Sequence, residues 1–301
     1  MTEMYPASFD YQRADSVEEA LSLLASANGQ DAQLLAGGHG LIPDMKSQEA
    51  TPDLLIDIGD IDALQSIECD EAADSVSIGA LTTHAELASS DILAESVPVL
   101  KQAAAQVADL QIRNKGTIGG NLAEADVEAD LPAAILALDG TIHAEGPAGS
   151  RTIPVGEFFQ GEGETALAPD ELLTSIAVPT IDTGAYVRKT HPARGYAMVG
   201  VAVTLEIADT EIEDASIAAV GVQDRPIRLT SVEEALVGLT TTELTEQTDP
   251  ILSETVQVAS YDLEDDHAYG DLHASADFRA DLLPTYAERA ILAAIEGGEH
   301  R

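Results

Sequence analysis

The stretch Gln111-Ile112-Arg113-Asn114-Lys115-Gly116-Thr117-Ile118-Gly119-Gly120-Asn121 is the most specific part of this sequence. Two basic residues and a threonine stand before a pair of glycines, and the acidic Asp130 follows. An earlier segment, Ala36-Gly37-Gly38-His39-Gly40, holds a second glycine pair. Glycine lacks the β-carbon that would keep a ligand away from backbone amides, so such pairs are typical of phosphate-binding loops. Two of them predict one phosphate group held from two sides.

Other residues support this reading, although a plainer one stays open. Only 14 residues are lysine or arginine, and six of them fall in three short windows: Lys46, Arg113, Lys115, Arg188, Lys189 and Arg194. We expect these positions to face a bound anion; the alternative is that they pair with neighbouring acids. Asp130 suits a ribose hydroxyl or an adenine edge. The plainer reading of the two segments is a pair of glycine turns and a helix N-cap.

The charge balance is extreme, with 54 acidic residues, 14 basic residues and a net charge of −40. Such a surface repels nucleic acid and anionic membranes. The acids are spread along the chain, so we expect a halophilic protein of a salt-rich cytoplasm, where a Debye length of roughly 3 Å at about 1 M salt screens the repulsion. A calcium-binding protein would need clustered acidic loops of the D-x-D-x-D kind, which are absent.

The single cysteine, Cys69, excludes an intrachain disulfide and an iron–sulfur cluster held by this chain, since a cluster needs about four cysteines. We expect Cys69 to be a small buried hydrophobic residue. No apolar run approaches the roughly 20 residues of a membrane helix, and the N-terminus lacks the pattern of a secretion signal. These features favour a cytoplasmic protein without a transmembrane segment.

The predicted strands and helices place a boundary between two domains near residues 179–184. The first, residues 1–179, divides into subdomains of about 1–58 and 59–179; the second covers 184–297. Residues 8–58 are expected to form a β-α-β-β unit that contains a capping box at Ser16, with Asn28 and Gly29 ending its helix. The later expected elements are a strand at 76–80, a capping box at Thr83, a helix at 97–108, a loop at 113–121, a helix at 130–138, a strand-rich segment at 141–179, three strands at 185–190, 198–207 and 215–222, a helix opening at Ser231, and a solvated loop at 262–271.

The fingerprints G-x-G-x-x-G and G-x-x-x-x-G-K-[ST] are both absent, which argues against a Rossmann domain and a P-loop NTPase. Leu34 to Lys46 instead resembles the first FAD loop of the medium, FAD-binding subunit of molybdenum hydroxylases, the relatives of carbon monoxide dehydrogenase and xanthine dehydrogenase. Ile112 to Asn121, with the residues up to Ala134, resembles the second loop. The segments 78–84, 185–189 and 276–279 also fit, so the resemblance covers nearly the whole chain.

The resemblance implies a p-cresol methylhydroxylase-type FAD-binding domain of two α+β subdomains, followed by a C-terminal domain of a three-stranded sheet and helices. Asp130 would meet the ribose or adenine, and Leu173 and Lys189 would lie near the flavin. Gly40 departs from a serine that is common there and keeps only its amide. Leu35 is implied to bind the cofactor. The residues implied to hold the FAD diphosphate are Ala36, Gly37, Gly38, His39, Gly40 and Leu41 in the first loop, and Thr117, Ile118, Gly119, Gly120 and Asn121 in the second.

Some roles stay open within the resemblance. Tyr186 would either approach the isoalloxazine or belong to the strand core, and His39 would either touch the cofactor or only shape its loop. The seven histidines show no metal signature, and His84 is expected to be a surface or supporting residue. Valine at Gly119 or Gly120 is expected to abolish FAD retention in a chain that still folds.

Family membership further implies an electron-transfer role without substrate oxidation in this chain. A large molybdopterin subunit and a small subunit with two [2Fe–2S] clusters would be the partners, in a heterohexamer built as a dimer of heterotrimers. Electrons would reach FAD and leave to a quinone or NAD. Two alternatives remain: a self-contained flavin reductase related to UDP-N-acetylenolpyruvoylglucosamine reductase, which would need its own catalytic acid, and an assembly module that has lost FAD.

Overall fold

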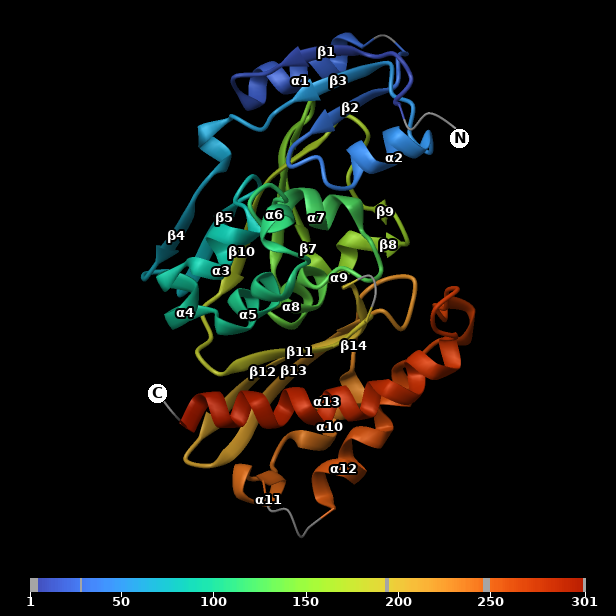
Figure 1. Ribbon diagram of the computed structural model, residues 1–301. Helices are drawn as coiled ribbons and strands as arrows, with labels where there is room; N and C mark the ends of the chain where they lie inside the picture. The colour runs from blue at the N-terminus through green and yellow to red at the C-terminus, as the bar shows by residue number, and fades with distance from the viewer. Residues whose placement is uncertain (1–4, 28, 193–194, 246–249, 300–301) are drawn as a thin grey trace.

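The computed structural model describes residues 5–27, 29–192, 195–245 and 250–299. The chain stacks three units, with the N-terminal unit at one end, the C-terminal sheet and its helices at the other, and a mixed unit between them (Figure 1). Asn28, which was expected to end the first helix together with Gly29, lies outside the described residues. None of the described helices combines the length and the hydropathy that a membrane crossing requires.

The N-terminal unit is a small parallel sheet in the order β1-β3-β2. Ser16 begins the first helix, and its hydroxyl accepts a hydrogen bond from the amide of Glu19. The expected β-α-β-β order is wrong, because a second helix follows Gly40 and separates the second strand from the third. These two strands are parallel neighbours in the sheet, and such strands need a crossover connection of this kind. Its Pro43 stands in the first turn, where proline is tolerated. The elements are β1 (Asp10–Arg13), α1 (Val17–Ser26), β2 (Ala32–Leu35), α2 (Leu41–Ser47) and β3 (Leu54–Asp57).

The middle unit contains an antiparallel sheet in the order β4-β5-β10-β6-β7, covered by short helices. The Thr83 capping box is confirmed. Its elements are η1 (Asp62–Leu64), β4 (Ile67–Asp70), β5 (Ser75–Gly79), α3 (His84–Ser89), α4 (Asp91–Ser96), α5 (Pro98–Gln106), α6 (Leu110–Arg113), α7 (Ile118–Glu124), α8 (Leu131–Ala137), β6 (Thr141–Gly146), β7 (Gly149–Pro154), α9 (Val155–Phe158), β8 (Phe159–Gly161), β9 (Glu164–Thr165) and β10 (Leu172–Pro179).

Two expectations for this unit are wrong. The stretch 113–121 is a loop only between α6 and α7, since α6 ends at Arg113 and the second glycine pair lies in the first turn of α7. Cys69 is exposed on β4, which is an edge strand of the sheet.

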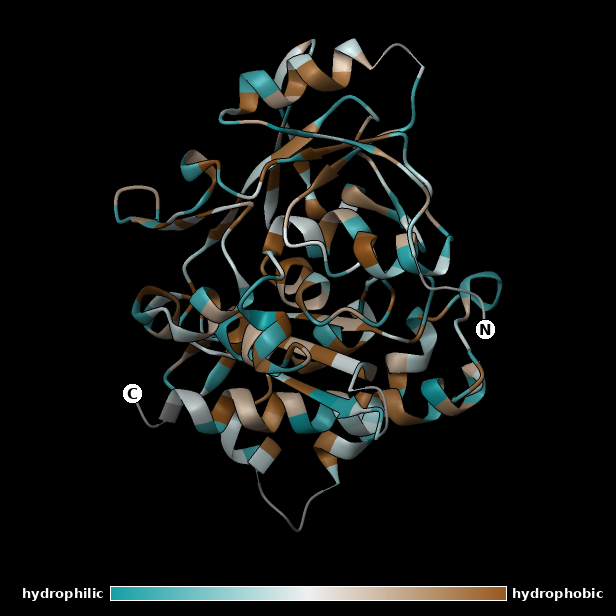
Figure 2. Cartoon of the chain, turned by 45° about the horizontal axis from the view of Figure 1, so that its top comes forward, coloured by the Kyte–Doolittle hydropathy of each residue, from teal (hydrophilic) through white to brown (hydrophobic). Residues whose placement is uncertain are grey.

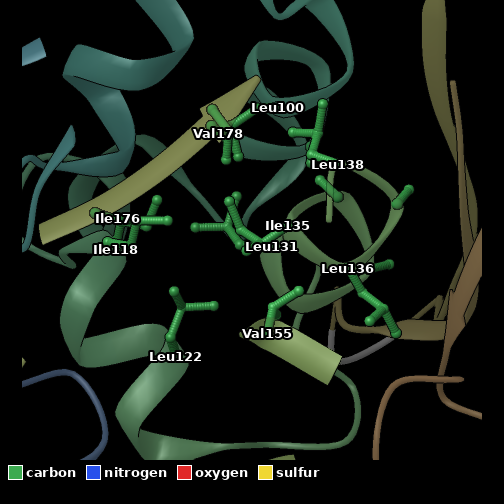
Figure 3. Close-up of a cluster of buried hydrophobic side chains, with 14 of the residues drawn as sticks. Leu100, Ile118, Leu122, Leu131, Ile135, Leu136, Leu138, Val155, Ile176 and Val178 are labelled. Carbon is green, nitrogen blue, oxygen red and sulfur yellow. The ribbon is translucent and has the colours of Figure 1, made fainter. Parts of the chain in front are cut away.

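Helix α8 is buried along its whole length and organises the core of the middle unit. Figure 3 shows Leu131 and Ile135 of this helix directed toward Ile118 of α7 and Ile176 of β10. Each fully buried leucine or isoleucine side chain contributes roughly 1.5–3 kcal/mol relative to an exposed one. Because Ile118 belongs to this core, it anchors the first turn of α7, which contains the second glycine pair.

The C-terminal domain is an antiparallel sheet in the order β11-β12-β13-β14 with α13 packed against β11 and β12. The three expected strands are present, and the two-residue strand β14 extends the sheet to four. Along α13, hydrophobic and hydrophilic segments alternate, as expected for a helix with one face on a sheet (Figure 2). The elements are β11 (Gly184–Thr190), β12 (Ala197–Ala208), β13 (Glu211–Val220), β14 (Ile227–Arg228), α10 (Thr230–Leu236), α11 (Thr241–Thr245), α12 (Ile251–Thr255), η2 (Val256–Asp262), η3 (Asp265–His267) and α13 (Ala276–Glu299).

The segment 262–271, expected to be a solvated loop, is anchored at both ends. Asp262 accepts hydrogen bonds from the amide and hydroxyl of Ser231 at the start of α10. Asp271 accepts hydrogen bonds from the backbone amides of His273 and Ala274, just before α13. The opposite face of the C-terminal sheet packs on α5 and α8, which brings β11 next to the middle unit.

Candidate cofactor site

A cavity of about 670 Å³ lies where the three units meet. This volume falls in the range of about 300–1,000 Å³ that is usual for small-molecule and cofactor sites. Its wall combines the loop between β2 and α2, the first turns of α7, the segment 126–130 before α8, the start of β10 and a few residues of the C-terminal domain. The two glycine pairs, far apart in sequence, therefore face one cavity.

The first glycine loop touches the second one through its backbone. A β-carbon added to Gly37 would lie 2.2 Å from the carbonyl oxygen of Lys115, which excludes any side chain at this position. Gly38 has a φ of +72°, a conformation that glycine adopts without strain. Gly37 is thus required by the close approach of the Lys115 backbone, and Gly38 is required by its backbone conformation.

The same loop presents unused hydrogen-bond donors to the cavity. Within the described residues, the amides of Gly37 to Leu41 donate to no backbone or side-chain acceptor. Backbone amides usually find an acceptor when they leave solvent, so a row of free ones on a cavity wall suits an anionic ligand.

The second glycine pair has a different role from the first. Gly119 donates to the Ala80 carbonyl at 2.8 Å, Ile118 donates to the Thr82 carbonyl at 3.0 Å, and Gly120 donates to the Thr117 hydroxyl at 3.2 Å. A β-carbon on Gly119 would lie 2.6 Å from the β-carbon of Ala80. This glycine is needed for packing against the end of β5, so valine at Gly119 should disturb the fold as well as the cavity.

The structure brings nearly all the expected site residues to the cavity wall. Leu173 and Asp130 line it together with the two loops, whereas Ile118 faces the core and Lys189 on β11 does not line it. The Asn121 side-chain oxygen is buried and has no hydrogen-bond partner within the described chain. The expected residues that line the cavity are Leu35, Ala36, Gly37, Gly38, His39, Gly40, Leu41, Thr117, Gly119, Gly120, Asn121, Asp130 and Leu173.

Asp130 stands at the N-cap position of α8, but its carboxylate does not cap the helix. It accepts the Tyr186 hydroxyl at 2.6 Å and the Arg188 Nη1 at 2.7 and 2.8 Å. Burial raises the pKa of this carboxyl, while Arg188 and Tyr186 act in the opposite direction. Tyr186 is itself buried, absent from the cavity wall and held by Asp130, which agrees with the strand-core alternative.

Two of the clustered basic residues have partners within the chain, although Arg188 also lines the cavity. Arg188 pairs with Asp130, and Arg113 donates to the carbonyl oxygens of Val107 and Ala108 at 2.7 and 3.0 Å. Arg194 lies outside the described residues. The ion pair between Arg188 and Asp130 joins two domains, so the sequence around either residue does not predict it.

His84 is buried on the cavity wall, where its ring lies against Gly116. Burial, followed by the charges of His39 and Arg113, lowers the pKa of His84 to about 4, so the ring is neutral near pH 7. His39 lines the cavity from the first loop. No cluster of metal-binding side chains occurs among the residues that the structure describes.

Two acidic residues of the site, Glu124 and Glu128, were not predicted. Glu128 pairs with Arg279 of α13 at 2.7 Å, and Arg279 is fully buried and also donates to the carbonyl oxygens of Met198 and Gly221. Glu128 and Asp130 stand two residues apart, and each binds an arginine of the C-terminal domain. The spacing of the two acids was visible in the sequence, but their partners were not.

Comparison with known proteins agrees with this geometry. Residues 7–181 match the family described as the FAD binding domain in molybdopterin dehydrogenase, and residues 186–294 match the CO dehydrogenase flavoprotein C-terminal domain. The carbon monoxide dehydrogenase medium chain of Afipia carboxidovorans is 40% identical over 78% of this chain and 82% of its own length. That of Hydrogenophaga pseudoflava is 35% identical over 97% of this chain and 98% of its own.

A solved structure, reconstituted CO dehydrogenase from Oligotropha carboxidovorans, superimposes with a TM-score of 0.88 at 35% identity, over 97% of this chain and 99% of that one. The α+β fold of an FAD-binding domain followed by a C-terminal domain is thereby confirmed. The chain belongs to the FAD-binding medium subunits of the molybdenum hydroxylases, the oxidoreductase family of carbon monoxide and xanthine dehydrogenases.

Proposed function

We propose that this chain holds FAD between the two glycine loops and passes electrons from an iron–sulfur partner to an external acceptor, either a quinone or NAD. The assembly would contain a large molybdopterin subunit and a small [2Fe–2S] subunit, as a dimer of heterotrimers. The observation that carries the proposal is the row of free amides from Gly37 to Leu41 on a cavity closed by the second loop.

The residues present fit FAD. The amides of the first loop would donate to the diphosphate, and the buried, unpartnered oxygen of Asn121 would accept from a hydroxyl or amino group of the cofactor. Leu173 and Leu172 add an apolar part to the wall at the start of β10, which suits an aromatic ring system. Arg188 and Asp130, tied to each other, fix the wall between the domains. FAD, when bound, supplies one- and two-electron transfer.

The other redox centres are proposed to lie in partner subunits. Cys69 is the sole cysteine in the sequence, so the chain cannot supply the thiolates of a cluster. Three carboxylates on the cavity wall, those of Asp130, Glu128 and Glu171, are engaged by arginines and so do not supply the catalytic acid that a self-contained reductase would need.

The proposal includes a halophilic setting, which rests on the net charge of −40. In dilute salt the like charges repel each other and oppose folding, whereas about 1 M salt reduces the Debye length to roughly 3 Å. Cofactor retention should therefore be measured in concentrated salt as well as in dilute salt.

The test is the absorbance spectrum and an FAD titration of the purified chain in about 0.1 M and about 1 M KCl. We expect a yellow, stoichiometric complex in the higher salt. Gly37→Ala should lose it, because the added β-carbon meets the Lys115 carbonyl, while Gly156→Ala should retain it, because no atom lies within 4 Å of that position. A folded wild-type chain that takes up no FAD at either salt concentration would refute the proposal. Native co-purification then identifies the partner subunits and the substrate that bleaches the flavin.

A further inference from the structure

The side chain of Glu124 lies beside the first glycine loop, in space that a side chain at position 40 would fill. It is the last residue of α7, and its carboxylate lies against Gly40 of the first loop. A β-carbon on Gly40 would be 2.0 Å from Oε1 and 2.6 Å from Oε2 of Glu124. The absence of a side chain at Gly40 thus admits a carboxylate beside the free amides.

The electrostatic surroundings of Glu124 differ from those of three other carboxylates on the wall. Glu128, Asp130 and Glu171 are paired with Arg279, Arg188 and Arg151 respectively. The charges that act most strongly on Glu124 are both negative.

Those charges come from the elements packed around it. Asp44 lies on α2 and Asp126 lies on the segment after α7, and both line the cavity. Burial, Asp126 and Asp44 together raise the pKa of Glu124 to about 7. The cavity wall also carries His39 on the first loop and His84 on α3, and the pKa of His84 is about 4, so its ring stays neutral at neutral pH.

We propose that Glu124 makes FAD retention depend on protonation: the diphosphate binds beside Gly40 with the Glu124 carboxyl neutral, and ionisation of this carboxyl weakens binding. This inference rests on the proposed function, because it assumes that the first loop binds the diphosphate. A neutral carboxyl can donate its proton to a phosphate oxygen, whereas a carboxylate can only repel it.

The direction of the pH dependence follows from linkage. A bound anion disfavours the ionised form, so the pKa of Glu124 is higher in the complex than in the free chain. The complex therefore takes up a proton over the range between the two values. Affinity is constant below the free pKa and falls up to about tenfold for each pH unit above it, until the pKa of the complex is reached.

The experiment compares FAD dissociation constants at about pH 6 and about pH 8, at constant concentrated salt, by the quenching of flavin fluorescence. We expect wild type to bind about tenfold more weakly at the higher pH. Glu124→Gln, which stays neutral, should bind equally well at both. His39→Asn is the matched control, because a histidine can also titrate in this range and would give the same sign; it should keep the wild-type slope.

Calorimetry in two buffers of different ionisation enthalpy supplies a second measurement. Wild type should take up a fraction of one proton on binding near pH 7, and Glu124→Gln should take up none. A Glu124→Gln variant that keeps the wild-type slope and proton uptake would overturn the role of Glu124, as would a wild-type affinity that does not change with pH. If none of the three proteins binds FAD at any pH, the proposed function itself fails.

Discussion

Removing the guanidinium of Arg188 tests how strongly the two domains depend on each other. The side chains of Arg188 and Asp130 are only 7% and 5% exposed, and the arginine also donates to the carbonyl oxygen of Gln106. In Arg188→Met the apolar stem is largely kept, but a buried carboxylate loses its counter-charge. Breaking one side of a buried ion pair costs about 3–5 kcal/mol, so we expect the free energy of unfolding to fall by about 4 kcal/mol at neutral pH.

The charge on Asp130 can be separated from the packing of Arg188 in two ways. In the double variant Arg188→Met, Asp130→Asn no charge is stranded, and we expect it to be about 2 kcal/mol more stable than Arg188→Met alone. Lowering the pH should act in the same direction. Without Arg188, burial raises the folded-state pKa of Asp130 further above its unfolded value near 3.8. A raised carboxyl pKa removes stability as pH rises, so the deficit of Arg188→Met should shrink toward acid pH.

Chemical denaturation followed by circular dichroism, in concentrated salt at several pH values, measures these differences. The reasoning would be refuted by an Arg188→Met deficit below about 1 kcal/mol, or by a double variant no more stable than the single one. Either result would mean that Asp130 gains little from its partner across the domain boundary.

Two further outcomes can be measured on the same apparatus. Gly119→Val should lose about 1–3 kcal/mol of unfolding free energy, because the new side chain meets Ala80, whereas Gly156→Val should stay within about 0.5 kcal/mol of wild type; equal stability of the two variants would contradict the packing role of Gly119. His84 has a folded pKa of about 4, below its unfolded value of 6.5, so wild type should lose about 3 kcal/mol relative to His84→Gln as pH falls from about 6.5 to about 4; parallel pH profiles would show that His84 is not buried in its neutral form.

Local signals in the sequence predicted the parts of the fold that local physics determines. The capping box at Thr83 and the alternating residues of β12 needed only their neighbours, and both are present in the structure. The first glycine loop was also predicted from local sequence, because its conformation and its close packing require glycine at Gly37 and Gly38. Helix α2 was not predicted, although Pro43 falls where a helix tolerates it.

The parts that were wrong depend on contacts between distant segments. Glycine has a low helix propensity, so the pair at Gly119 was taken for a loop, yet Thr117 caps that helix and Ala80 leaves no room for another residue. Cys69 is exposed because β4 ends the sheet, which a strand's own pattern does not reveal. The partner of Arg188 was not identified, because this carboxylate, that of Asp130, is 58 positions away in the chain.

The segment 126–130 has a consequence for how such a chain can change over time. One acid in it is held by Arg188 and another by Arg279, both supplied by the C-terminal domain. The two domains, which meet near residue 180, therefore cannot be exchanged independently of each other during evolution, because each contributes one side of these ion pairs. A C-terminal domain borrowed from a relative would preserve the wall of the cavity only if it brought both arginines to the positions where they pair with these acids.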